Sequence, residues 1–337
     1  MRVLIADTFP DTYRRLLGDR GYDCRYQPDL TTADLPEHLG EVDALIVRST
    51  AVDAAAIEAA GTLGVIIRAG AGTNTIDCRA ATGAGIPVCN VPGRNAEAVA
   101  ELAFGLLLAL DRRIPDAVAE LRHGHWNKKW YAQATGIKGR DIGVVGLGQI
   151  GLAFAERAAA FGAQVHGIAS SDRPAHARER IDAIGIDLEP DLASLAERCD
   201  VLSLHVPATP RTRGMIDREL LARVRPGTII LNTARGELID EDALLEAMDA
   251  KGVRAGLDVF AGEPQGTTGT IDSRLARHPH VYGTHHIGAS TEQAQHAIAA
   301  EVVTMLDTIA HGTVPHCVNP EVTGPAGTRP RYAMAAS

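Results

Sequence analysis

Residues 141–169, DIGVVGLGQIGLAFAERAAAFGAQVHGIA, combine a short apolar run, three glycines at fixed spacing and a helical pattern. Gly146 would let the chain turn sharply out of a strand, and Gly148 would let a pyrophosphate approach the backbone. Gly151 would let the next helix pack close to the sheet. Free N–H groups and the positive dipole at the start of that helix would face the phosphates. The segment therefore predicts the strand, glycine turn and helix of a dinucleotide site.

The alternative interpretation is a glycine turn with a purely structural role. Glycine makes up 34 of the 337 residues, so the bare spacing is weak support for a ligand site. The context decides between the two, because an apolar run precedes the glycines and a second one, at 165–169, follows the helical pattern. This order favours the dinucleotide site.

Composition excludes several other classes of protein. The net charge is −9 and no basic tract is present, which argues against a nucleic-acid surface. Five scattered cysteines lack the spacing of metal ligands, so we expect free thiols in a reducing compartment and no metal site. No apolar run reaches membrane length, and the N-terminus MRVLIADTFP enters a strand at once without a signal peptide. We therefore expect a cytoplasmic protein with no membrane and no nucleic-acid partner.

Strand-like and helix-like patterns alternate along the chain, which is typical of parallel sheets covered by helices on both faces. Strands are expected at 2–6, 44–48, 65–69, 87–91, 142–145, 165–169, 201–206, 228–232 and 255–259. Helices are expected at 10–17, 53–60, 78–84, 96–110, 211–224, 240–250 and 290–312. The helix at 96–110 is apolar on most sides, so it should be buried between larger bodies.

These patterns predict an α/β fold with two doubly wound parallel-sheet domains. A flavodoxin-like substrate domain would comprise residues 1–95 and 287–320, and a Rossmann cofactor domain, residues 96–286, would be inserted in it. Residues 321–337 would form a tail. Ligands of such sheets bind at the carboxyl ends of the strands, so we expect the substrate in the cleft between the domains.

Three residues with suitable chemistry lie just beyond expected strand ends: Arg235, Glu263 and His286. Arginine can pair with a substrate carboxylate, and histidine is a general acid or base near neutral pH. A carboxylate can orient that histidine. Taken singly, each has a simpler explanation: a solvated arginine, a surface glutamate or a structural histidine.

Taken together, the motifs GLGQIG, LHVPATPRTRGMID, ILNTARGELIDEDAL, GLDVFAGEP and HHIGAST resemble those of the D-isomer-specific 2-hydroxyacid dehydrogenases. The resemblance covers about residues 2–320 and includes RAGAGTNTID at 68–77 and NVPGRNAEAVAELAFGLLLA at 90–109. Within the family it is strongest to the 3-phosphoglycerate dehydrogenase branch. It implies hydride transfer between NAD(H) or NADP(H) and a small (R)-2-hydroxy acid or its 2-keto form. Phosphoglycerate is the leading substrate, and acids of the glyoxylate, hydroxypyruvate or lactate type are the alternatives.

The resemblance also implies roles for individual residues. Arg235, Glu263 and His286 would be catalytic, with His286 rather than His285 in the catalytic place because it directly precedes IGAST. The implied cofactor contacts are Gly146, Gly148, Gln149, Ile150, Gly151, Ala169, Ser170, Ser171, Arg173, His205, Val206, Pro207, Thr212, Thr233, Ala234, Asp258 and Gly288. Among them, Asp258 would hold the nicotinamide end.

The substrate side is expected to comprise Arg48, Arg68, Ala71, Gly72 and Asn95. Backbone N–H groups near Ala71 and Gly72 would grip the substrate carboxylate together with Arg235. Arg48 and Arg68 would meet a distal phosphate, although surface or inter-strand salt bridges are the alternative for both. The resemblance further implies a homodimer, with the long helix from Asn95 and its neighbours at the interface.

Two departures from the family pattern matter. Ala169 stands where the family has its ribose-binding aspartate, while Ser170, Ser171 and Arg173 are suited to a 2′-phosphate. Alternatively, the displaced Asp172 still reaches the ribose, so the preference between NAD and NADP stays open. The chain also ends soon after VPHCVNP, so feedback through a C-terminal regulatory domain is not expected. The rival from another class is a dinucleotide-sensing binding protein of the same fold.

Overall fold

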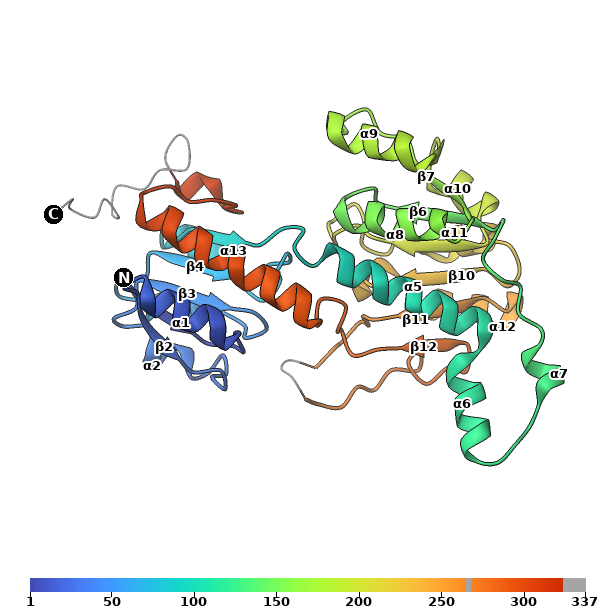
Figure 1. The fold of residues 1–337 in the computed structure, drawn as a ribbon, viewed down its shortest axis with the longest axis horizontal. Helices are drawn as coiled ribbons and strands as arrows, with labels where there is room; N and C mark the ends of the chain where they lie inside the picture. Colours follow the sequence, from blue (N-terminus) through green and yellow to red (C-terminus); the bar gives the residue numbers. More distant parts are fainter. Residues whose placement is uncertain (265–267, 324–337) are drawn as a thin grey trace. The chain divides into compact units, whose positions relative to one another are not determined.

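The computed structural model describes residues 1–264 and 268–323 and divides the chain into two compact units (Figure 1). Unit 1 comprises Met1–Asn95 with 268–269 and 290–323, and unit 2 comprises Ala96–Pro264 and Thr270–Ala289. Each unit is built on one parallel sheet, and the second unit lies within the sequence of the first, so the predicted fold class is confirmed. Most of the predicted tail, from residue 324 on, lies outside the described residues.

The sheet of unit 1 has five parallel strands in the order β2-β1-β3-β4-β5, the flavodoxin-like order. Its strands are β1 (Arg2–Ile5), β2 (Asp23–Tyr26), β3 (Ala44–Val47), β4 (Val65–Arg68) and β5 (Val88–Asn90). Its helices are α1 (Asp11–Asp19), α2 (Leu35–His38), α3 (Ala54–Glu58), α4 (Cys78–Gly83) and α13 (Glu292–Ala310), followed by the 3-10 turn η2 (Pro320–Val322).

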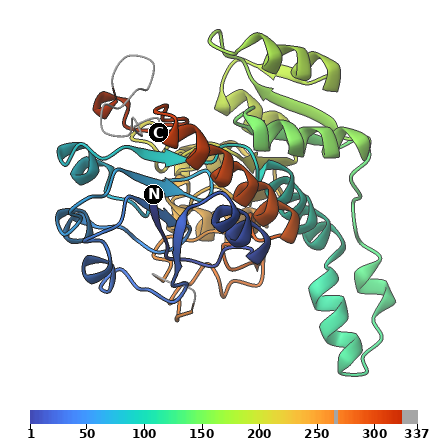
Figure 2. The ribbon, with the colours of Figure 1, turned by 60° about the vertical axis from the view of Figure 1, so that its left-hand side comes forward.

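Helices cover both faces of this sheet. Helices α1 and α13 lie side by side in both views of the ribbon (Figures 1 and 2) and bury their apolar residues on one face. The other face packs against α2, α3 and α4 through residues such as Leu35, Ile57 and Ala81. Because the strands are buried on both faces, β3 (ALIV) and β4 (VIIR) consist almost wholly of apolar residues.

Unit 2 has seven parallel strands in the order β12-β11-β10-β9-β6-β7-β8. Six of them, from β8 to β11, follow the doubly wound order of dinucleotide-binding domains. The strands are β6 (Asp141–Val145), β7 (Gln164–Ile168), β8 (Asp187–Glu189), β9 (Val201–Leu204), β10 (Ile229–Asn232), β11 (Arg254–Leu257) and β12 (Val281–Gly283).

The helices of unit 2 form two layers. Helices α5 (Ala96–Arg112), α8 (Gln149–Ala160) and α9 (Ala175–Ile184) bury their apolar residues on one face of the sheet. Helices α10 (Leu192–Arg198), α11 (Arg218–Arg223) and α12 (Glu241–Lys251) cover the other face. Helices α6 (Ile114–Arg122) and α7 (Lys128–Tyr131) follow α5, and the 3-10 turn η1 (Gly236–Leu238) follows β10.

The helix predicted at 211–224 is wrong over its first half, since only Arg218–Arg223 is helical. Gly214 adopts a left-handed φ of +63°, and Ile216 forms a parallel bridge with Ile239, so the chain is extended there. Asp217 then caps α11 by accepting a hydrogen bond of 2.8 Å from the Leu220 N–H.

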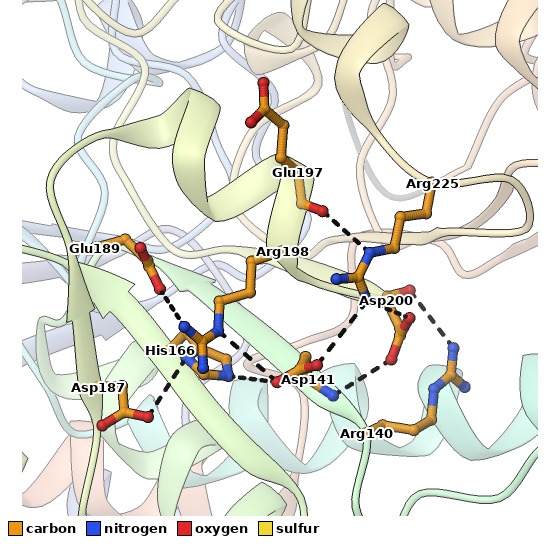
Figure 3. Close-up of polar contacts among 9 residues, drawn as sticks. All are labelled: Arg140, Asp141, His166, Asp187, Glu189, Glu197, Arg198, Asp200 and Arg225. Atoms are coloured by element: carbon orange, nitrogen blue, oxygen red, sulfur yellow. Dashed lines mark hydrogen bonds and ion pairs between the residues drawn. The ribbon is translucent and has the colours of Figure 1, made fainter.

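A polar cluster joins the amino-terminal ends of the strands in unit 2 (Figure 3). The buried His166 on β7 contacts Asp141, the first residue of β6, at 2.7 Å from Nε2 to Oδ1. Arg225, which precedes β10, pairs with Asp200 at 3.2 Å, and Arg198 pairs with Glu189 at 3.2 Å. This edge of the sheet is therefore held by contacts among its own charged residues.

Among residues 1–264 and 268–323, no helix combines the length and the apolar character that a membrane span requires.

Candidate active site

The carboxyl ends of three neighbouring strands carry the three candidate catalytic residues. Strands β10, β11 and β12 are adjacent in the sheet, and Arg235, Glu263 and His286 lie in the loops that follow them. Parallel strands bring such loops to one edge of a sheet. The topology therefore places the three residues at the same edge of unit 2.

The clearest contact in this group joins His286 to Glu263. The His286 Nδ1 lies 2.7 Å from the Glu263 Oε2, and the Phe260 N–H donates to the Glu263 Oε1 at 2.8 Å. A carboxylate at this distance favours the tautomer that carries its proton on Nδ1, which leaves Nε2 available to a substrate. About half of the His286 side chain is exposed, 48%, so a small molecule can reach this imidazole.

The charge state of Glu263 follows from competing effects. Burial alone would raise its pKa, but the hydrogen bonds from His286 and Phe260 and the nearby charges of His286 and Arg235 outweigh it. The pKa of Glu263 is therefore below its ordinary value, and the group is ionised at neutral pH. An ionised Glu263 can stabilise a protonated imidazole.

Arg235 is held by a turn that Asn232 organises. The fully buried Asn232 side chain accepts from the Ala234 N–H at 3.0 Å and donates to the Arg235 carbonyl at 2.8 Å. Burial lowers the pKa of Arg235, yet an arginine stays protonated at any physiological pH. A partly desolvated guanidinium attracts a carboxylate more strongly than one in water. Sequence analysis missed Asn232, whose one signal was an amide ending the apolar run IILN.

The loops after β10 and β11 are packed directly against each other. A Cβ on Gly236 would lie 2.3 Å from the Phe260 carbonyl carbon, so only glycine fits there. Glu241, the first residue of α12, accepts a hydrogen bond of 2.8 Å from the Ala261 N–H. These contacts fix the backbone that carries Arg235 relative to the backbone that carries Glu263.

Asp258 organises the loop that carries His286. Its buried carboxylate accepts from the Thr284 hydroxyl at 2.6 Å and from the N–H groups of Ile287 and Gly288, each at 2.8 Å. The His286 N–H donates to the Asp258 carbonyl at 2.8 Å, and His286 adopts a left-handed φ of +52°. A carboxylate offers about four acceptor positions, so roughly one remains for the predicted nicotinamide contact. Sequence analysis did not predict this role in shaping the loop.

The three glycines after β6 have distinct surroundings. Gly146 has a φ of +101°, and a Cβ there would lie 2.6 Å from the His205 carbonyl oxygen. A Cβ on Gly151 would lie 1.9 Å from the Gly146 carbonyl oxygen, so this glycine lets α8 pack onto the turn. A Cβ on Gly148 would meet nothing within 4 Å, which leaves space over the start of α8.

These surroundings fit a dinucleotide. Gly148 caps α8 without a side-chain hydrogen bond, so no side chain competes for the first N–H groups of the helix, which begins with the predicted contacts Gln149 and Ile150. The Thr233 hydroxyl, beyond β10, is buried and has no hydrogen-bond partner among the described residues. A bound cofactor would give both features a partner.

The remaining predicted cofactor residues follow β9. The Ser203 hydroxyl contacts the His205 Nε2 at 2.8 Å, and burial lowers the pKa of His205 to about 3, so this imidazole is neutral. The Thr212 hydroxyl donates to the Pro207 carbonyl at 2.6 Å and accepts from the Thr209 N–H at 2.8 Å. The Thr212 hydroxyl thus serves to fold the 206–212 loop.

The loop after β7 lacks a carboxylate at the strand end. The Ala169 N–H donates to the Glu189 carbonyl at 2.8 Å, and the Ser171 hydroxyl donates to Asp172 at 2.8 Å. The Arg173 guanidinium turns back to the Ile168 carbonyl, the last of β7. The structure therefore places a cation at the end of this strand.

The predicted substrate residues all lie in unit 1. Arg48 and Arg68 lie at the carboxyl ends of the paired strands β3 and β4. The Arg48 side chain donates to the Ser290 hydroxyl at 2.9 Å, and the charge of Asp7 acts on its guanidinium. A Cβ on Gly70, whose φ is +152°, would lie 1.6 Å from the Arg68 Nη1, so this guanidinium crosses the loop that contains Ala71 and Gly72.

Two side-chain amides border this loop and its exit. Asn90 donates to the Ala71 carbonyl at 2.6 Å. Asn95 is only 8% exposed, and its Oδ1 has no hydrogen-bond partner in the part of the chain that the structure describes. Both amides belong to the segment that leads from β5 towards α5.

Comparison with known proteins decides the family. The sequence model described as D-isomer specific 2-hydroxyacid dehydrogenase, NAD binding domain, matches residues 104–288. The chain belongs to this family. The matched range contains the glycine turn and all three candidate catalytic residues.

Individual relatives are similar over most of the chain. D-3-phosphoglycerate dehydrogenase from Mycobacterium bovis is 42% identical over 320 residues, 94% of this chain and 58% of the relative. The chain thus spans less than two thirds of that relative. Hydroxypyruvate reductase from Thermotoga maritima is 43% identical over 80% of this chain and 85% of its own length. The apo-structure of D-lactate dehydrogenase from Escherichia coli superposes with a TM-score of 0.78 at 26% identity, covering 94% and 100% of the two chains.

Proposed function

We propose that this protein is an NAD(P)-dependent oxidoreductase that interconverts a small (R)-2-hydroxy acid and its 2-keto form. The observation that carries the proposal is the 2.7 Å contact between His286 and Glu263 at the strand edge where Arg235 also lies. A general acid or base, a carboxylate that orients it and a cation for the substrate carboxylate form the set that this chemistry needs.

Each residue has a defined task in this scheme. Arg235 pairs with the substrate carboxylate and polarises the oxygen on C2. In oxidation, His286 accepts the hydroxyl proton on Nε2, and in reduction it returns a proton to the carbonyl oxygen. Glu263 keeps the Nδ1 proton in place and stabilises the imidazolium. A bound nicotinamide supplies or accepts the hydride.

A phosphorylated three-carbon hydroxy acid is the substrate that we favour. Arg48 and Arg68, at the ends of paired strands, suit a distal phosphate, and a D-3-phosphoglycerate dehydrogenase is among the similar proteins. A 2-keto acid of the hydroxypyruvate or glyoxylate type is the second candidate, because the hydroxypyruvate reductase from Thermotoga maritima is matched over 85% of its length. A panel of 2-keto acids with and without phosphate, assayed with NADH and NADPH, separates the two.

Replacement of His286 tests the proposal. His286→Ala should lower kcat by about 10²- to 10⁴-fold with little change in cofactor affinity, because only the proton-transfer group is lost. The neighbouring His285→Ala is the matched control, since His285 is also exposed and should keep near-normal turnover. Near-normal turnover of His286→Ala would refute the assignment.

The rival function is a dinucleotide-sensing binding protein of the same fold. Such a protein would bind NAD(H) or NADP(H) but would not turn over any acid in the panel. Measured turnover that depends on His286 excludes it.

A further inference from the structure

Two of the five cysteines face each other across a short antiparallel contact in unit 1. Cys89, in β5, pairs with Cys317, in the segment after α13. The Val318 N–H donates to the Val88 carbonyl at 2.8 Å, and the Asn90 N–H donates to the His316 carbonyl at 3.3 Å. These flanking bonds make Cys89 and Cys317 a non-hydrogen-bonded antiparallel pair, in which side chains approach most closely.

This backbone geometry suits a disulfide. Opposite residues of a non-hydrogen-bonded pair have Cα atoms about 4.5 Å apart, and disulfides span Cα separations of roughly 4.4–6.8 Å. The two side chains interact, since a hydrogen bond between them changes the pKa of each thiol. Both cysteines are free thiols in this structure.

The two thiols differ in access and acidity. Cys89 is fully buried, whereas Cys317 is partly exposed. The hydrogen bond from Cys89 outweighs burial and lowers the pKa of Cys317 to about 7, while the same contact and burial raise the pKa of Cys89. Cys317 is therefore the thiolate that reacts first, and Cys89 is the thiol that then reacts with the oxidised Cys317.

Asn319 holds Cys317 in this position. Its buried side chain accepts from the Val88 N–H at 2.8 Å and from the Cys317 thiol at 3.3 Å, and it donates to the Ile86 carbonyl at 3.0 Å. The amide thus ties the segment after α13 to Ile86 and Val88, next to Cys89 at the edge of the sheet. The thiols are held together by their surroundings before any bond forms.

We propose that Cys89 and Cys317 form an oxidation site at which hydrogen peroxide produces an intramolecular disulfide. The Cys317 thiolate attacks one peroxide oxygen, an S–O bond forms, the O–O bond breaks and water leaves after protonation. The Cys89 sulfur then attacks the sulfur of the resulting sulfenic acid, the S–S bond forms and a second water leaves. The two thiols lose two electrons and two protons, and the peroxide is reduced to two waters.

Peptide mapping of the full chain tests the proposal without any variant. After treatment with a small excess of hydrogen peroxide and blocking of free thiols under denaturing conditions, the number of blocked cysteines should fall by two from the five in the chain. One linked peptide should contain Cys89 and Cys317, and a dithiol reductant should restore all five thiols. Absence of this peptide, with Cys317 recovered as sulfinic acid instead, overturns the proposal.

Single replacements supply the matched controls. Cys89→Ser and Cys317→Ser should each abolish the loss of two thiols, whereas Cys24→Ser and Cys199→Ser should leave it unchanged. Cys78 is the informative competitor, because its charge is coupled to that of Cys317. A linked peptide that joins Cys78 to Cys317 in the unaltered chain would also overturn the proposal. If Cys89→Ser does not fold, the linked peptide of the unaltered chain still decides.

Discussion

At the scale of single residues, Asp258 connects the core of unit 2 to the proposed catalytic histidine. The Asp258 carboxylate accepts three hydrogen bonds, from Thr284, Ile287 and Gly288. In Asp258→Asn one oxygen becomes an NH2 group, which cannot accept a hydrogen bond and faces these donors. An unsatisfied buried partner costs about 1–3 kcal/mol, so we expect a lower melting temperature and a kcat reduced by about 10- to 100-fold. Thermal unfolding and steady-state kinetics check this, with the exposed Asp272→Asn as the control. Weaker cofactor binding with unchanged kcat and melting temperature would instead assign Asp258 to the nicotinamide alone.

Glu263 predicts a pH dependence of stability whose sign follows from its lowered pKa. A carboxyl group with a depressed pKa in the folded protein stabilises the fold fully above its ordinary pKa, near 4.5, and loses that contribution as pH falls through the folded value. Glu263→Gln removes this contribution. The difference in melting temperature between the parent and Glu263→Gln should therefore be largest near neutral pH and should shrink below about pH 4.5. A difference that grows on acidification would contradict the lowered pKa.

Sequence analysis identified the polar residues that stand alone at strand ends, but it did not identify the residues that hold them. Arg235 and Glu263 follow the expected strands 228–232 and 255–259, so their place at the edge of a sheet could be predicted, whereas the strand before His286, β12, was not expected. Asn232 and the loop contacts of Asp258 depend on which backbone groups fold back onto these side chains. That information is tertiary, and no spacing in the sequence contains it. The catalytic roles themselves stay predictions.

At the scale of elements, the strands that sequence analysis missed are edge strands. Strands β2, β8 and β12 all lie at the edge of a sheet. Strand β2 (DCRY) and β8 (DLE) are short and partly charged, because an edge strand is exposed on one side and is not buried like β3. The central strands are more apolar, and β3 (ALIV) and β4 (VIIR) are almost wholly so, which is why their sequences predicted them clearly.

The residues of the loop after β7 allow a prediction of the preference between NADH and NADPH. Ala169→Asp would place a carboxylate at the strand end, where it accepts hydrogen bonds from the ribose and repels a 2′-phosphate. We expect the ratio of kcat/KM values to shift towards NADH by about tenfold or more, since a charged hydrogen bond contributes roughly 1.5–3 kcal/mol. Arg173→Ala should weaken the use of NADPH selectively, because the guanidinium lies at the same strand end.

Kinetics with both cofactors at saturating keto acid measure this preference. Arg178→Ala, an exposed arginine on α9, is the control for a general change in charge. If the parent ignores NADPH and Arg173→Ala changes nothing, the 169–173 loop is only a surface turn and Asp172 or the backbone holds the ribose.

At the scale of the whole molecule, the return of α13 to unit 1 follows from its apolar face. Ile298, Val302 and Leu306 of this helix are buried with Val3 and Ile67 of the five-stranded sheet. The sequence-based domain assignment already grouped residues 287–320 with the first sheet, but the helical pattern did not show which face of that sheet would receive the helix. The position of α13 depends on which face of the first sheet is left uncovered, and that sheet is formed by residues near the opposite end of the chain.

The homodimer expected from the sequence would form through α5 and its neighbours. In the single chain, these helices differ in how much of their apolar surface is already buried. Helix α5 uses most of its apolar surface within unit 2, where Ala103, Leu107 and Leu110 are buried. Helix α6 has no buried residue, and Ile114, Val118 and Leu121 form one stripe at helical spacing. In both views α6 extends away from the sheet of unit 2 (Figures 1 and 2). We therefore propose that α6 is a central part of the interface between two copies.

Charge on the α6 stripe tests this proposal. Leu121 is 56% exposed in the single chain and Trp126 is 81% exposed, so both are available to a second copy. The double variant Val118→Glu with Leu121→Glu should be monomeric, because two unpaired carboxylates would be buried at a dimer interface. Its melting temperature should stay near that of an isolated parent subunit, since neither side chain is buried in the chain itself.

Sedimentation velocity at several concentrations measures the oligomeric state. The control is Leu188→Glu, at an exposed position on the edge strand β8, which should leave the dimer intact. A parent that sediments as a monomer would exclude the dimer. A double variant that still dimerises would place the interface elsewhere.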